Sequence, residues 1–137
     1  MNSRIIRISL LFAVTATAVS LSAFIPSQDK PWVVPEKFVK MANPVNSDAA
    51  SLKEGKELWA RNCQSCHGKT GMGDGLKAFQ LKSALVDFST DLVQKQTNGA
   101  LFFKISEGRS DMPSFKKKLE SEQDIWNLIN YLRTLRK

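Results

Sequence analysis

The sequence predicts an all-α domain of about 3–5 helices. A capping box, Ser51 to Glu54, is predicted ahead of a stretch in which apolar residues recur every three or four positions. A second stretch with the same spacing follows Ser121 and runs to the C-terminus. Alternation of apolar and polar residues never extends beyond four positions, so no strand is expected.

Length and charge bound the class of protein. The chain has 137 residues, which fits one domain with appended segments. Its net charge is +7, but the positive residues are scattered and no basic run is interleaved with aromatic residues. This distribution gives no indication of nucleic-acid binding. A mild basic excess suits docking to an acidic protein surface, and it equally suits plain solubility.

Residues 1–25 are expected to form a signal peptide or an N-terminal membrane anchor. Arg4 and Arg7 precede an uncharged run from Ile8 to Gln28, as in export signals. The run is long for a signal core and just long enough to span a bilayer, so residues 5–25 could also serve as an uncleaved anchor. Either alternative places the following residues outside the cytoplasmic membrane.

Residues 26–50 are predicted to be a proline-containing linker. They hold four of the five prolines in the chain, which favours an extended segment rather than a helix. Trp32, Val33, Val34 and Phe38 are apolar for a free tether. They either pack against the domain or a partner subunit, or form a local patch without function.

A helix is expected from Leu52 to Asn62, immediately before the first cysteine. Gly55 lies on its apolar face with Leu58 and Trp59. Glycine inside a helix costs about 1 kcal/mol relative to alanine. Its presence therefore predicts that another helix crosses closely at this point.

The residues after this helix read Cys63-Gln64-Ser65-Cys66-His67-Gly68. Two thiols separated by two residues and followed by histidine are typical of covalent c-type haem attachment. Cys63 and Cys66 would form thioethers to the porphyrin, and His67 would bind the iron on the proximal side. Gly68 would let the backbone pass close to the ring.

Three alternatives explain the motif less well. A structural zinc site needs four ligands, whereas Cys63, Cys66 and His67 supply three. A thioredoxin-like redox pair lies within a βαβ pattern, which is not found here. A disulfide between Cys63 and Cys66 would leave His67 without a role.

The remaining elements follow in order. Gly71 to Gly75 predicts a loop with positive φ angles. Thr97 to Gly99 is predicted to be a turn, and Ala100 to Glu107 a short helix that Gly108 stops. The last helix begins at Ser121. Its buried face is expected to hold Ile125, Leu128, Ile129, Leu132 and Leu135.

The second iron ligand is predicted to be Met112. His67 is the only histidine, so a bis-histidine iron cannot form within this chain. Of the four methionines, Met1 and Met41 lie outside the domain, and Met72 follows His67 closely within the glycine loop. Pro113 restricts Met112 to an extended conformation that can direct the thioether inward.

With these motifs placed, residues 51–137 resemble a monohaem class I c-type cytochrome. The order of helix, CxxCHG, G-x-G-D-G, helix, Met112-Pro113-Ser114-Phe115 and terminal helix carries the resemblance. It implies a small cytochrome c fold around one covalent haem c and its iron, with the first and last helices crossing. Many relatives have a proline after the motif whose carbonyl orients the histidine. This chain lacks it, so a carbonyl near Ser83 or Ala84 is expected to take that role.

The resemblance implies a one-electron carrier rather than an enzyme, with His/Met ligation, in a respiratory chain on the periplasmic or extracytoplasmic side. Its partners would be redox proteins, a respiratory reductase or oxidase with an acidic docking face. The lysines expected to ring the exposed haem edge are Lys69, Lys77 and Lys116–Lys118. Two alternatives stay open: a sensor or enzyme with an open distal site, and a tethered subunit docked through Trp32–Phe38.

Overall fold

The computed structural model describes residues 31–137, and in this part the chain is helical without a strand. The elements are α1 (Glu36–Val39), α2 (Ala49–Asn62), α3 (Gln64–His67), the 3₁₀ helix η1 (Ala78–Gln80), α4 (Asp91–Gln94), α5 (Asn98–Glu107) and α6 (Glu122–Arg133). The all-α prediction is confirmed. Six α-helices exceed the expected 3–5 because α1, α3 and α4 are single turns of four residues.

The predicted signal or anchor, residues 1–25, lies outside the described residues. Within residues 31–137, none of the helices has both the length and the apolar composition needed to cross a membrane.

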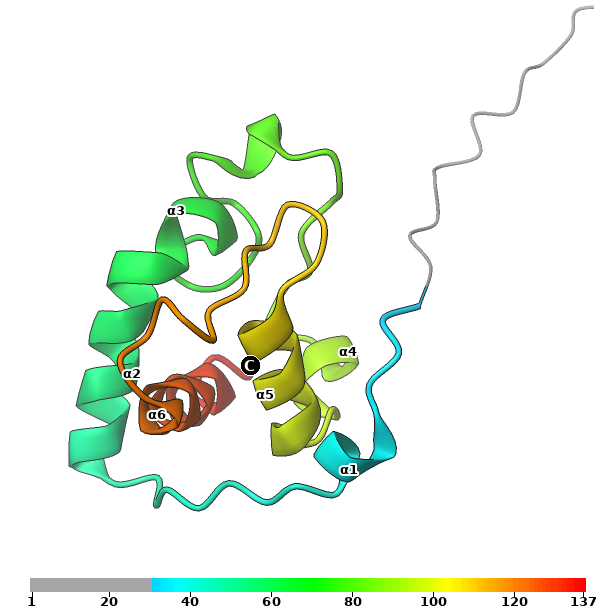
Figure 1. Cartoon of the computed structure of the whole chain (residues 1–137). Helices are drawn as coiled ribbons and strands as arrows, with labels where there is room; N and C mark the ends of the chain where they lie inside the picture. Colours follow the sequence, from blue (N-terminus) through cyan, green and yellow to red (C-terminus); the bar gives the residue numbers. More distant parts are fainter. Residues whose placement is uncertain (1–30) are drawn as a thin grey trace, which may run out of the picture.

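Helices α2 and α6 make the most extensive contact in the molecule, crossing at the left of Figure 1. Gly55 lies at the crossing. A Cβ atom there would overlap the backbone carbonyl of Asn127 and lie 2.8 Å from Cβ of Tyr131. The prediction that a helix crosses closely at Gly55 is therefore confirmed.

The predicted start of α2 is wrong by three residues. The helix begins at Ala49, and its N-cap is Asp48, whose carboxylate accepts a 2.9 Å hydrogen bond from the backbone N–H of Ser51. Ser51 is therefore inside the first turn, and its buried hydroxyl donates instead to Oδ1 of Asn127 on α6, at 2.8 Å. The Ser51–Glu54 capping box does not form, because Asp48 caps the helix three residues earlier and the Ser51 hydroxyl is bonded to α6.

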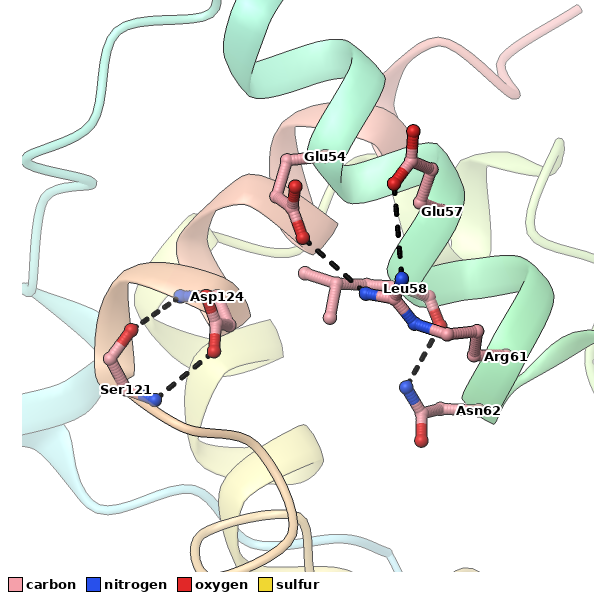
Figure 2. A network of polar contacts seen from close by, with 7 residues as sticks. All are labelled: Glu54, Glu57, Leu58, Arg61, Asn62, Ser121 and Asp124. Atoms are coloured by element: carbon pink, nitrogen blue, oxygen red, sulfur yellow. Dashed lines mark hydrogen bonds and ion pairs between the residues drawn. The ribbon is translucent and has the colours of Figure 1, made fainter.

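The last helix begins as expected. Ser121 and Asp124 form a reciprocal capping box, which is drawn at the left of Figure 2. Four residues of the predicted stripe are buried and Leu135 is partly buried beyond the helix end.

Figure 2 also shows Arg61 of α2 reaching Glu54 and Glu57. These ion pairs are exposed and contribute little to stability.

Helix α5 closes the core opposite the α2–α6 pair. Thr97 caps it by accepting from the N–H of Ala100, so Asn98 and Gly99 are helical rather than the predicted turn. Gly108 ends it with a φ of +68°, as predicted. The core lies between these three helices and comprises chiefly Leu58, Trp59, Leu101, Phe102, Ile105, Phe115, Ile125, Trp126, Leu128, Ile129 and Leu132.

The segment before α2 is not the extended linker that the prolines predicted. It contains α1, which packs on α5 and places Phe38 against Phe103, with ring centroids 4.9 Å apart. Beyond α1 the chain runs along the lower edge of the molecule in Figure 1. There Asn43 donates to Oδ1 of Asn130 on α6 at 2.8 Å. Proline excluded a long helix but not a single turn, because Pro35 occupies the N-cap.

Candidate haem site

The predicted attachment motif forms its own turn between two helices. Cys63 follows the end of α2, and α3 spans Gln64–His67. Gly68 then takes a φ of +83°, and a Cβ atom there would overlap the carboxylate of Asp74. The glycine is thus required by its own backbone conformation and by Asp74, in addition to any closeness to a ring.

The glycine loop after the motif is packed onto the backbone of the motif. The N–H of Gly73 donates to the carbonyl of His67 at 2.9 Å, and that of Gly75 to the carbonyl of Cys66 at 3.1 Å. A Cβ atom on Gly75 would lie 2.5 Å from that same carbonyl. Positive φ is confirmed at Gly71 and Gly73, with values of +76° and +78°. The loop therefore holds the motif rigidly in place.

A cavity of about 550 Å³ opens beside the motif, and most of the surface that lines it is apolar. All four predicted site residues, Cys63, Cys66, His67 and Met112, lie on its wall. Its volume is within the range of about 300–1,000 Å³ that is usual for ligand sites. An inner recess continues from it and has both His67 and Met112 on its wall.

Two aromatic side chains hold the imidazole of His67. The ring of Phe88 meets it edge-on at a centroid distance of 5.0 Å, and the ring of Trp59 lies 5.8 Å away. Trp59 is fixed in turn, since its indole N–H donates to the carbonyl of Gly68 at 3.1 Å. Burial lowers the pKa of His67, which favours the neutral imidazole that binds metals.

The Nδ1 atom of His67 is buried without a hydrogen-bond partner in the part of the chain described. Ser83 and Ala84, whose carbonyls were expected to orient this nitrogen, lie on the cavity wall, but neither is bonded to it. A buried ring nitrogen without a partner is uncommon in proteins. The expected orienting hydrogen bond is therefore not formed in this structure, and Nε2 is the ring nitrogen that would be left for the iron.

Met112 is presented by a tight turn after α5. Backbone hydrogen bonds join Arg109 and Met112 in both directions, at 2.8 and 2.9 Å. The next residues are held to α5 as well, because the N–H of Phe115 donates to the carbonyl of Ile105 at 3.2 Å. The turn is thus tied to the helix that forms one wall of the cavity.

The two thiols are not joined by a disulfide. Burial raises the pKa of Cys63 to about 12, with a further contribution from the neighbouring Cys66. A reactive redox cysteine has a lowered pKa, so this environment is unlike a thioredoxin-type pair. Over residues 31–137, moreover, no cluster of three or more His, Cys, Asp and Glu side chains is placed to hold a metal ion.

Three wall residues were missed by the sequence analysis: Phe88, Lys104 and Arg109. Phe88 lies in a weakly patterned stretch, and no local spacing connects it with His67. The two cations carried no signal either, because they resemble the many scattered surface charges of the chain. The role of Trp59 in the site was also missed, although its place on the buried face of α2 was predicted.

A family model described as cytochrome c oxidase, cbb3-type, subunit III, matches residues 50–132. The chain belongs to this family. A cbb3-type cytochrome c oxidase subunit CcoP from Azospirillum sp. (strain B510) is 31% identical over 107 residues, which cover 72% of this chain. This chain spans only 33% of that relative, so the activity of the whole relative is not carried over.

Two solved structures show the same fold. A reducing HAO-like protein complex from Kuenenia stuttgartiensis is 25% identical, with a TM-score of 0.61, over 80% of this chain and 52% of its own. The c-type cytochrome KustC0563 is 27% identical, with a TM-score of 0.53, over 61% of this chain and 98% of its own. The resemblance to c-type cytochromes is therefore confirmed.

Membership of this cbb3-type family establishes the cofactor as covalently bound haem c with its iron, and the chemistry as haem-based electron transfer in a respiratory chain. The residues present fit this group. The cavity is mostly apolar and of suitable size, two thiols lie on its wall, and burial lowers the pKa of the histidine there, which favours the neutral form that binds metals. Which residues bind the haem stays a prediction, namely Cys63, Cys66, His67 and Met112.

Proposed function

We propose that this chain is a one-electron carrier whose haem is attached through Cys63 and Cys66 and whose iron is bound by His67 and Met112. The main support is the shared cavity, since these four residues are the ones that the sequence predicted and all of them line it. The inner recess adds to this, because His67 and Met112 both contribute to its wall.

When bound, the haem supplies an iron that cycles between the ferrous and ferric states. The chain contributes the surroundings of that iron. Met112 and His67 would hold this iron, and a thioether ligand together with an imidazole would favour the reduced state and raise the potential. The apolar wall does the same, because the additional charge of the oxidised centre is poorly solvated there. Phe88 and Trp59 hold His67 in one orientation and keep water from it.

The absorption spectrum of haem-matured protein tests the ligation, with Met112→Ala compared to Met72→Ala. Met72 is a matched control because it is a loop methionine with 46% of its surface exposed. We expect the ferric wild type and Met72→Ala to be low-spin, with a weak thioether-to-iron band at the red edge. Met112→Ala should lose that band.

A high-spin ferric wild type that binds carbon monoxide when reduced would contradict the proposal. The distal site would then be open, and the protein would be a sensor or a ligand-binding enzyme. Loss of the band in Met72→Ala instead of Met112→Ala would contradict the assignment of the ligand.

We further propose that the docking partner is a redox protein with an acidic face, a respiratory reductase or oxidase. The loop after the attachment motif supports this. Leu76 is 87% and Phe79 82% exposed, and the exposed Lys77 lies between them. The N–H of Lys77 donates to the carbonyl of Ser65, at 2.8 Å, so this surface adjoins the attachment motif. Large exposed apolar groups among charges are typical of interaction sites.

Reduction rates with membrane vesicles from the source organism test this docking surface. Lys77→Glu should slow the second-order rate several-fold at low salt, since a steering charge is reversed. Lys53→Glu, at the far end of α2, makes the same charge change away from the loop and should have little effect. Equal effects of the two variants would reject this surface.

Finally, we propose that residues 1–25 place the domain outside the cytoplasmic membrane, as a cleaved signal or as an anchor. N-terminal sequencing of the mature protein from membrane and periplasmic fractions separates these alternatives. Recovery of the full chain from the cytoplasm, without haem, would contradict both. A retained segment in the membrane fraction would favour a tethered subunit.

A further inference from the structure

A cluster of one indole and two cations lies on the cavity wall. Lys104 Nζ is 5.5 Å from the ring centroid of Trp32, and the guanidinium carbon of Arg109 is 5.7 Å from the same centroid. All three residues contribute to the cavity wall. Each is only partly exposed. The cluster is therefore a positive patch on an otherwise mostly apolar wall.

Neither cation has a carboxylate partner within residues 31–137. No ion pair involves Lys104 or Arg109, and the Lys104 ammonium donates to the neutral Oε1 of Gln96 at 2.6 Å. Burial lowers the pKa of Lys104, and the charge of Arg109 lowers it further. Two neighbouring cations beside an apolar cavity are costly unless an anion accompanies them. The arrangement indicates an anionic ligand.

The indole is supplied by residues 31–46, the strap, which precedes the family match that begins at residue 50. Three anchors hold the strap in place. Phe38 packs on Phe103, and its carbonyl lies where a Cβ atom of Gly99 would be. Asn130 donates to the carbonyl of Val45 at 3.2 Å. The strap thus lies ahead of the segment that the family model matches, and it contributes Pro31 and Trp32 to the cavity wall.

We propose that Trp32, Lys104 and Arg109 form a subsite for the two carboxylates of the haem, and that the strap closes this subsite. The inference rests on the proposed haem attachment. Its basis is charge complementarity, since a haem carries two propionates and the wall offers two cations without acidic partners. The cations hold both carboxylates ionised in a partly desolvated place.

The consequence concerns proton uptake. Paired with cations, a carboxyl group has a lowered pKa and stays ionised above about pH 5. The midpoint potential should therefore be flat from about pH 5 to 8. Removing one cation raises the pKa of a propionate into this range. Its deprotonation then favours the ferric state, so the potential falls as pH rises.

Other titratable groups on the wall are Asp111, His67 and the two cysteines. His67 and the cysteines are occupied by ligation and attachment in the proposed holo-protein. Asp111 is therefore the competing carboxyl. It accepts a 2.8 Å hydrogen bond from the backbone N–H of Lys82, and Asp111→Asn removes it.

The experiment measures midpoint potential against pH in the haem-matured wild type, Lys104→Gln and Arg109→Gln. We expect the reduction equilibrium constant of each variant to change about threefold across this pH range. A threefold change corresponds to a propionate pKa that differs by about half a unit between the ferrous and ferric protein. Lys95 is an exposed lysine that caps the C-terminus of α4 and pairs with Asp91, so Lys95→Gln is the charge control and its profile should stay flat. Lys104→Arg should also stay flat.

The slope of Lys104→Gln should persist when Asp111→Asn is added, and its loss there would assign the proton to Asp111 and overturn the subsite. Flat profiles in both glutamine variants would overturn it too.

Trp32→Leu should produce a smaller slope of the same sign, and hydrogen exchange over residues 31–41 should increase. The absorption spectrum distinguishes the two proposals. A normal spectrum with flat variants refutes the subsite alone, whereas a high-spin wild type refutes the ligation.

Discussion

At Gly55 and Gly75 a side chain is excluded because another part of the backbone lies too close. Neither residue has a positive φ, yet a Cβ atom on Gly55 would overlap the carbonyl of Asn127 and one on Gly75 would approach the carbonyl of Cys66. Backbone atoms cannot move aside without moving their helix or turn. Gly55 therefore sets the separation of α2 and α6, and Gly75 sets the loop against the haem-attachment motif.

We predict that Gly55→Ala destabilises the holo-protein by about 2 kcal/mol. Overpacking costs about 1–3 kcal/mol, and a clash with a backbone carbonyl belongs at the upper end of that range. Alanine recovers about 1 kcal/mol of helix propensity, which leaves a net loss of about 2 kcal/mol. Denaturant unfolding followed by circular dichroism measures the change. Lys56→Ala, at the exposed neighbouring position, is the control and should change stability by less than about 0.5 kcal/mol. A Gly55→Ala variant as stable as this control would contradict the close crossing.

Among the elements, α2 illustrates how two candidate caps compete. Asp48 and Ser51 are three residues apart, and either can begin a helix by the rules of local sequence. The structure uses Asp48 and leaves Ser51 free to bond Asn127 and Asn130 on α6, at 2.8 and 2.9 Å. With Asp48 as the cap, Ser51 forms buried hydrogen bonds between α2 and α6. Rules of local sequence do not describe such contacts between helices.

We predict that Asp48→Ala costs about 1 kcal/mol of stability, as loss of an N-cap usually does. Asp48→Ser should recover most of this, since a hydroxyl can also accept from the N–H of Ser51. Ser51→Ala should be costly for another reason, because it leaves buried amide groups of Asn127 and Asn130 with one partner fewer. Thermal unfolding of the three variants tests the assignment. Full rescue of Asp48→Ala by a new acidic residue at position 50 would indicate a movable cap instead.

At the scale of the whole molecule, sequence could predict the roles of those residues whose chemistry is indicated by their near neighbours in the chain. The spacing of Cys63, Cys66 and His67 and the pair Met112-Pro113 indicate their chemistry within a few residues. Phe88 against His67, and Trp32 against Lys104, depend on how distant segments pack. The prolines around Trp32 predicted an extended linker, because they report backbone preference alone, and they left open whether its apolar residues pack on the domain. Its packing is decided by Phe38 and Asn43, through contacts with α5 and α6.

The α2–α6 pair and the cavity are expected to respond differently when the protein lacks haem. In a Cys63→Ala/Cys66→Ala variant the cavity of about 550 Å³ loses its occupant, and its apolar wall is open to water. The α2–α6 pair is also held by contacts that do not line the cavity, namely the close approach at Gly55 and the Ser51–Asn127 hydrogen bond. We therefore expect most of the far-ultraviolet circular dichroism to remain, while near-ultraviolet circular dichroism and a sharp unfolding transition are lost.

Hydrogen exchange locates the loss along the chain. Amides of α2 and α6 should stay partly protected, whereas those of residues 69–92 and 108–116, which carry the glycine loop, Phe88 and Met112, should exchange rapidly. Haem-matured Met112→Ala is the control, because it keeps the cofactor and should retain protection in residues 69–92. A variant without haem that unfolds as cooperatively as the wild type would show that the protein core alone determines the fold. Uniform loss of protection, α2 and α6 included, would show instead that the haem is needed for the helix pair itself.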